Sequence, residues 1–160
     1  MKPLEHPDSF HLRAAEGWVE LGNHVEANAE LEMIAPELRA HPEVLEVRWH
    51  LLATARKWEA CVEIATAIAE LVPEQPHGWI HRSFALHELK RTAEARDNLL
   101  PVLDQFPDDA LMRYNLACYE CQLGNLGEAK RWLETAFKLG GKAQIKLMAI
   151  GDRADASKSQ

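Results

Sequence analysis

Two cysteines separated by two residues form the most metal-like motif of this sequence. Cys118 and Cys121 would lie one turn apart on a helix, with both thiols on the same face. Two thiolates at this spacing suit two positions of a tetrahedral metal site, which needs two further ligands. His87 is the one nearby candidate for a third ligand, so this set gives a metal-binding or redox protein as one alternative function. The simpler interpretation is two small residues in a core or groove.

A pair of histidines forms the second set of candidate ligands. His77 and His81 are four residues apart, and on a helix they would share a face. They could chelate a metal together with His50 or Glu43 from the neighbouring helix. The chain holds eight histidines, so pairs at this spacing are expected by chance. Solvated surface histidines are the simpler interpretation, and we expect no metal and no cofactor.

The motifs of common catalytic sites are missing from the sequence. There is no glycine-rich phosphate loop, no H-E-x-x-H and no G-x-S-x-G. The cysteine, histidine and glutamate candidates would lie on an open surface that does not exclude water. We therefore expect a protein that is not an enzyme.

The elements that must position these residues recur every thirty-four residues. Residues 110–143 indicate two amphipathic helices joined at Gly124 and Asn125. One helical hairpin cannot bury its own apolar face, so further hairpins should stack against it. Sliding the chain by thirty-four residues aligns a small residue in each unit, namely Ala27, Cys61, Ala95 and Ala129. The period predicts four tandem hairpins.

Prolines mark where the helices begin and end. Pro42 and Pro76 each stand at the start of a unit, in a first turn where the missing N–H costs nothing. Pro36 should end or kink the second helix of its unit, and Pro101 should kink the second helix of the third unit, because proline removes an i to i−4 hydrogen bond. We predict a flexible lead, four hairpins, a short capping helix and a disordered tail, over residues 1–7, 8–41, 42–75, 76–109, 110–143, 144–151 and 152–160.

The length, cysteine count and net charge of the chain exclude several classes of protein. The chain has 160 residues, enough for one core of ordinary size, and 47% of them are hydrophobic. No apolar run approaches the roughly 20 residues needed to cross a bilayer, and the first residues carry no secretory signal. Three cysteines do not indicate a disulfide framework, which fits a cytoplasmic protein. A net charge of −7 repels phosphate backbones, so we expect neither a nucleic-acid nor a membrane partner.

The repeat resembles the tetratricopeptide repeat family, whose period is thirty-four residues and whose pattern is W-x2-L-G-x2-Y, then A-x3-F, then P. Trp79 stands at the tryptophan place of the third unit, Leu116 and Ala117 stand at the Leu-Gly place of the fourth, and Pro107 matches the closing proline. Trp49 departs from the pattern, since the family has glycine or alanine there. The resemblance implies an all-α, right-handed α-solenoid of four hairpins with a C-terminal capping helix.

The resemblance also implies a function. Family members bind an extended peptide or a helix of a partner protein in a concave groove lined by the first helix of each hairpin. The corresponding residues of this chain are Arg13, Glu46, His50, His77, Ile80, His81, Phe84, His87, Tyr114, Asn115 and Cys118. This apolar and aromatic floor with acidic neighbours favours a segment with apolar anchors beside basic residues.

A small secretion-type chaperone is the principal alternative among binding proteins, because such chaperones are also short, acidic and built of these repeats. Trp58 and Trp132, at the edges of second helices, are the candidates for a homodimer contact.

Overall fold

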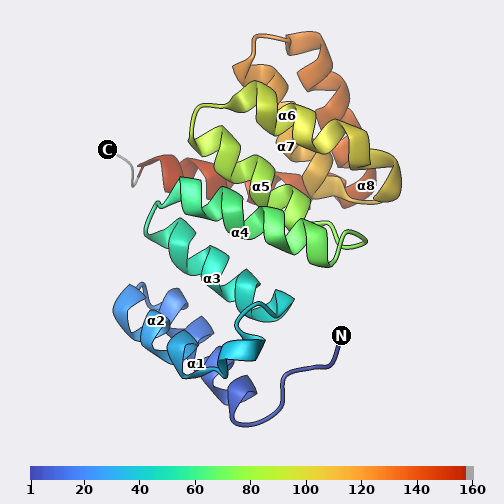
Figure 1. Ribbon diagram of the computed structural model, residues 1–160. Coiled ribbons are helices and arrows are strands. Elements are labelled where there is room, and N and C mark those ends of the chain that lie inside the picture. Colours follow the sequence, from blue (N-terminus) through green and yellow to red (C-terminus); the bar gives the residue numbers. More distant parts are fainter. Residues whose placement is uncertain (158–160) are drawn as a thin grey trace. The chain divides into compact units, whose positions relative to one another are not determined.

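The computed structural model describes the backbone of residues 1–157 and the side chains up to Lys146 (Figure 1). Within those residues every regular element is helical, which confirms the all-α prediction. No helix among them combines the length and the apolar character that crossing a bilayer requires. The elements in chain order are α1 (Asp8–Glu20), α2 (His24–Met33), the 3-10 helix η1 (Pro36–Leu38), α3 (Pro42–Thr54), α4 (Trp58–Leu71), α5 (His77–Glu88), α6 (Thr92–Leu99), the 3-10 helix η2 (Leu100–Gln105), α7 (Ala110–Gln122) and α8 (Leu126–Ser157).

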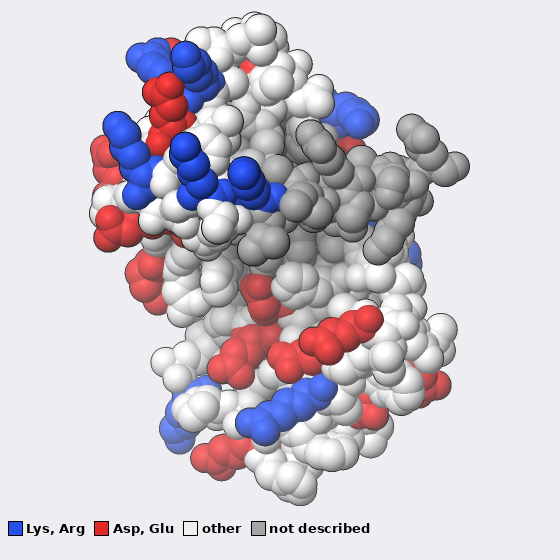
Figure 2. Space-filling view, turned by 180° about the vertical axis from the view of Figure 1, so that it is seen from behind, with Lys and Arg blue, Asp and Glu red and all other residues white. Residues whose placement is uncertain are grey.

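The helices divide into two compact units, Met1–Arg91 and Thr92–Gln160. Charge is shared unequally between them. The sequence of the N-terminal unit holds 15 acidic and 9 basic residues, a difference of six negative charges, whereas the C-terminal unit holds 10 and 9, a difference of one. Figure 2 shows acidic side chains gathered on one face of the N-terminal helices. Most of the net charge of −7 therefore belongs to the N-terminal unit.

One type of turn recurs at thirty-four-residue spacing after each of the helices α1, α3, α5 and α7. After α1 the N–H of Asn23 donates to the carbonyl of Trp18 and the N–H of Gly22 donates to Val19, each at 2.9 Å, which is the Schellman motif. The residue at the centre of the turn has a positive φ each time, at Gly22 (74°), Arg56 (56°), Lys90 (64°) and Gly124 (81°). The thirty-four-residue period of the sequence therefore also appears in the backbone conformation, as a positive φ at the same place of each turn.

Proline ends α2 as the sequence predicts, and it ends α6 where the sequence predicts a kink. Helix α2 stops at Met33, and the chain passes through Ile34 and Ala35 in extended conformations before Pro36 begins η1. Helix α6 stops at Leu99 and gives way to η2, which contains Pro101. Pro42 occupies the first turn of α3, also as predicted, whereas Pro76 lies one residue earlier, at the N-cap of α5.

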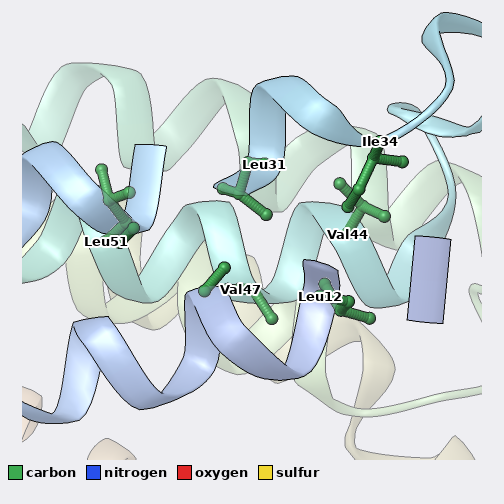
Figure 3. Close-up of a cluster of buried hydrophobic side chains, with 8 residues drawn as sticks. Leu12, Leu31, Ile34, Val44, Val47 and Leu51 are labelled. Carbon is green, nitrogen blue, oxygen red and sulfur yellow. The ribbon is translucent and has the colours of Figure 1, made fainter. Parts of the chain in front are cut away.

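The core of the N-terminal unit joins α1, α2 and α3. Leu12 of α1, Leu31 of α2 and Val44 of α3 lie in one buried cluster with Ile34, Val47 and Leu51 (Figure 3). Each of these side chains contributes roughly 1.5–3 kcal/mol when it is buried completely. Because α3 is packed on both α1 and α2, the residues of α3 that do not face this cluster are held in fixed positions.

Helices α4 and α5 approach closely at a glycine. A Cβ atom built on Gly78 would stand 2.5 Å from the backbone nitrogen of Ala69 and 2.8 Å from its Cα. Only a residue without a side chain fits this contact. The contact sets the position of α5 against α4, and with it the position of the histidines that α5 carries.

The C-terminal unit turns back on itself at a glycine. Gly141 (φ 75°, ψ 156°) is a non-helical residue inside α8, which separates a helical segment before it from one after it. After this turn Ile145 is 2% exposed and is clustered with Tyr114 of α7 and Ala136 of α8. The expected capping helix over 144–151 lies in the second segment, although the side chains from Leu147 onward are outside the described residues.

The helix continues past the end that the sequence predicts for it. Residues 152–157 are helical, where we expected a disordered tail, and residues 158–160 lie outside the described part of the chain. The segment 152–157 contains neither proline nor glycine, and alanine and arginine favour the helical state. The division of the chain at 144, 151 and 152 stays a prediction.

Candidate functional site

Three polar side chains from α3 and α5 converge in the N-terminal unit. Glu46 and His50 are one turn apart on α3, and their Oε1 and Nε2 atoms are 3.4 Å apart. His81 reaches the same carboxylate oxygen from α5, with its Nε2 atom 2.5 Å away. One donor atom from each residue lies within 4.8 Å of the others. Among the described residues this is the one group of three that could hold a metal ion.

Trp49 holds His81 in place. Its indole ring stacks on the imidazole with the ring centroids 3.9 Å apart and an interplanar angle of 15°. The indole is 6% exposed and is packed in a cluster with Cys61, Ala65 and Ala85. Among the described residues the Nε1 atom of Trp49 finds no hydrogen-bond acceptor. The tryptophan that departs from the repeat pattern is therefore buried, and its ring fixes the orientation of the His81 imidazole by stacking.

The carboxylate of Glu46 is held in its charged form. Its partial burial would raise the pKa, but hydrogen bonds from His50 and His81 and the attraction of both rings outweigh burial and hold the pKa of Glu46 well below its usual range. Side-chain exposure rises across the group, from 14% for His81 to 29% for Glu46 and 50% for His50. The group therefore has one side packed on protein and one side open.

The residues expected in the groove are found in three environments. Arg13, His50 and His77 are exposed. Two expected floor residues are buried instead, Ile80 at 8% and Tyr114 at 7% exposure. The others are half-buried, namely Glu46, His81, Phe84, His87, Asn115 and Cys118. The role of these exposed and half-buried residues in binding a partner stays a prediction.

Tyr114 is a core residue because of the turn at Gly141. The turn brings Ile145 back onto α7, where it covers the aromatic ring together with Ala136. The periodic pattern of the repeats contains no information about a turn that follows the last repeat. This is why the sequence places Tyr114 on an open floor.

Phe84 and Trp58 are neighbours and partly cover one another. Their ring centroids are 5.7 Å apart in an edge-on arrangement, and Phe84 also meets Trp49 at 6.3 Å. Trp58 is half-buried against the cluster of Trp49, Cys61, Ala65 and Ala85, so it is not free at the edge of its helix. The homodimer contact suggested for Trp58 and Trp132 stays a prediction, and Trp132 is half-buried as well.

The two metal-ligand sets suggested by the sequence differ from the group that the structure forms. His77 lies beside His81 with 6.3 Å between the ring centroids, but Glu46 takes the place suggested for Glu43, which is exposed. Glu46 lies one turn from His50, whereas Glu43 lies two turns away. His87 is in the N-terminal unit, and Cys118 and Cys121 are in the C-terminal unit, so that set stays a prediction.

A signal for this group was present in the sequence. Glu46 holds the fifth place of its unit and His81 the sixth place of the next. Equal places of consecutive repeats lie side by side, and the fifth and sixth places are adjacent, so these two residues are candidates for contact.

Neither a scan against protein-family models nor a search of curated proteins finds a match to this chain. Solved structures do match. TTC0263, a thermophilic TPR protein in Thermus thermophilus, superposes with a TM-score of 0.74 at 18% identity, over 86% of this chain and 77% of that one. MamA from Desulfovibrio magneticus RS-1 superposes with a TM-score of 0.72 at 10% identity, over 82% and 75% of the two chains. A MamA MSR-1 structure gives 0.69 at 20% identity, over 85% and 78%.

These matches and the recurring turn agree on one architecture. The chain has the fold of the tetratricopeptide-repeat solenoids, as the sequence pattern predicts. At these identities the likeness extends to the fold alone.

Proposed function

We propose that this chain, with its tetratricopeptide-repeat fold, is a protein-interaction module that binds an extended or helical segment of another protein along its first helices. The observation that carries the proposal is a set of exposed and half-exposed polar side chains on α1, α3 and α5. We call this set the first-helix face, and its members are Arg13, Glu16, Glu46, His50, His77 and His81. Glu16 takes the place in α1 that His50 takes in α3, thirty-four residues on.

The charge of the N-terminal unit supports a cationic partner segment. That unit carries six of the seven net negative charges, and Glu16, Glu43 and Glu46 lie on its first helices. Acidic surfaces raise the rate of association with basic partners and fix their orientation. The half-buried ring of Phe84 offers an apolar contact beside this charge. The favoured partner is therefore a segment with an apolar anchor next to lysine or arginine.

Binding rather than catalysis fits the openness of the first-helix face. The side chains of His50 and His77 are exposed, so water reaches them freely. A general base or nucleophile gains most in a site from which water is excluded. The secretion-chaperone alternative and the cytoplasmic location stay predictions from the sequence.

The proposal is tested by selecting peptides and then mapping where they bind. Random peptides displayed on phage are selected on the purified full chain, and the enriched peptides are synthesised and titrated by fluorescence anisotropy. Two variants with the same change in net charge are compared. Glu16→Lys alters the first-helix face, and Glu63→Lys alters an exposed residue of the second helix α4.

We expect enriched peptides with an apolar residue beside basic ones. Glu16→Lys should weaken their binding about three- to tenfold, because a reversed charge at the rim of an interface costs about 1 kcal/mol. Glu63→Lys should leave the affinity unchanged within twofold. Equal weakening by both variants, or weakening by Glu63→Lys alone, would place the binding surface elsewhere and overturn the proposal.

A further inference from the structure

We propose that Glu46, His50 and His81 bind one divalent transition-metal ion, with Zn²⁺ as the best-matched ion. Nothing in the repeat pattern requires a metal at this place. The inference does not depend on the proposed protein-interaction function, because it concerns an ion that the isolated chain would bind by itself.

The donor set matches the ligands that zinc prefers. Zinc in proteins is bound by imidazole nitrogen and carboxylate oxygen, and three protein ligands with a fourth open position are common. Two imidazoles also favour a transition metal over Ca²⁺ or Mg²⁺, which take oxygen ligands. The half-exposed His50 leaves one side of the group open, where a water molecule would complete a tetrahedral shell.

The two distances from the Glu46 oxygen to the imidazole nitrogens lie within about 1 Å of those in a bound site. Ligand bonds of about 2.0–2.1 Å at tetrahedral angles separate the donor atoms by about 3.3 Å. The Glu46 and His50 atoms are 3.4 Å apart and meet this value. The Glu46 and His81 atoms are 2.5 Å apart, the distance of a short hydrogen bond. Exchanging the shared proton for a metal ion requires these two atoms to separate by less than about 1 Å.

All three ligands are on rigid supports. Glu46 and His50 project from adjacent turns of α3, which is fixed on α1 and α2 by the buried cluster around Val44. His81 is fixed by its stacking on Trp49, with the Nε2 atom directed at the carboxylate. A preformed arrangement of this kind reduces the side-chain conformational entropy that is lost when the ion binds. Without it, the imidazoles on the surface would bind metal weakly and singly.

The test is a metal titration of the full chain without a histidine tag, after treatment with a chelator. Zn²⁺ is titrated by isothermal calorimetry, and Co²⁺ is titrated by visible absorption, since tetrahedral Co²⁺ has intense d–d bands. The variant His50→Ala removes the most exposed ligand, and its fold is checked by circular dichroism. His24→Ala, which removes an imidazole outside the group, is the matched control.

We expect one equivalent of Zn²⁺ to bind at micromolar or tighter affinity and Co²⁺ to give a tetrahedral spectrum. His50→Ala should weaken binding at least tenfold and abolish that spectrum, and Glu46→Gln should do the same. His24→Ala should change the affinity by less than twofold. The site is refuted if no saturable binding is seen, if the folded His50→Ala protein binds as well as the parent chain, or if His24→Ala weakens binding equally. The peptide titration compares Glu16→Lys with Glu63→Lys, which leave these three ligands unaltered, so the two proposals are tested separately.

Discussion

The cysteine side chains differ in environment in a way that controls their reactivity. Cys61 is fully buried, its Sγ lies 3.8 Å from the carbonyl oxygen of Trp49, and burial raises the pKa of the thiol to about 11. Cys121 is exposed and Cys118 is partly exposed. Because the thiolate is the reactive form, a higher pKa and burial both slow alkylation.

We predict that iodoacetamide at pH 8 modifies Cys121 first and Cys61 at least about a hundredfold more slowly in the native protein. Mass spectrometry of the digested protein at timed intervals gives the rate at each site. In denaturant the three rates should become similar, which provides the control. Fast native modification of Cys61 would show that hairpin two opens readily or that its small residue is not at the helix contact.

Residue-level features of the site were only partly predictable. The sequence identifies Glu46, His50 and His81 as residues of the first-helix face, because the repeat assigns each a place. It does not reveal that Trp49, at a place reserved for glycine or alanine, would support His81 by stacking. The burial of Tyr114 depends on a single turn beyond the repeats, at Gly141, so no periodic argument reaches it.

Two glycines test how closely the helices pack, because one has open space around its Cα and the other contacts a neighbouring helix. Gly17 lies inside α1, and a Cβ atom there would meet nothing within 4 Å, whereas one on Gly78 would clash with the backbone of Ala69. We predict that Gly17→Ala stabilises the protein by about 0.5–1 kcal/mol, since alanine is the better helix former. Gly78→Ala should destabilise it by about 1–3 kcal/mol, because α4 and α5 must separate.

Chemical denaturation of the two variants measures this difference. Alanine does not lower the helix propensity at either position, although its gain is smaller at Gly78, the second residue of α5, so a loss of stability there reports the contact. If both variants gain stability, α4 and α5 can separate without loss, and the close approach at Gly78 does not constrain the positions of α5 and His81.

At the scale of elements, several helix ends and turns can be predicted from the sequence, because proline and glycine act on the local backbone. Proline interrupts helices by chemistry that acts locally, so Pro36 predicts the end of α2, and Pro101 predicts an interruption where α6 gives way to η2. The hairpin turns followed from glycine at Gly22 and Gly124, but Arg56 and Lys90 adopt the same conformation without a glycine signal. Residues 152–157 are helical although their polar composition predicts a disordered tail, because alanine and arginine favour the helical state.

Ile145 connects the last helical segment with the rest of the C-terminal unit. It is 2% exposed and packs on Tyr114 and Ala136, so it covers an apolar face that would otherwise meet water. We predict that Ile145→Asp lowers the free energy of unfolding by about 2–5 kcal/mol and promotes self-association. Lys146→Asp, at the exposed neighbouring residue, should change it by less than about 0.5 kcal/mol.

Thermal unfolding and size-exclusion chromatography with light scattering measure the two effects. If Ile145→Asp remains monomeric with the melting temperature of the parent chain, the segment after Gly141 does not act as a cap. Deleting Gln144 to Gln160 should then also be harmless, which gives a second measurement of the same property.

The recurring turn also bears on the order in which the chain folds. A non-glycine residue in the left-handed conformation costs about 1–2 kcal/mol, so closed turns at Arg56 and Lys90 should be roughly 5 to 30 times rarer in the unfolded ensemble than those at Gly22 and Gly124. Repeat chains can nucleate at any hairpin and propagate from it. Pulsed hydrogen exchange during refolding should therefore protect the amides of α1 and α2, and of α7 and the first segment of α8, before those of α3 and α4. Early protection of α3 and α4 would contradict this order. Folding would thus begin at the two ends of the chain, and the hairpin that carries Glu46 and His50 would be completed between them.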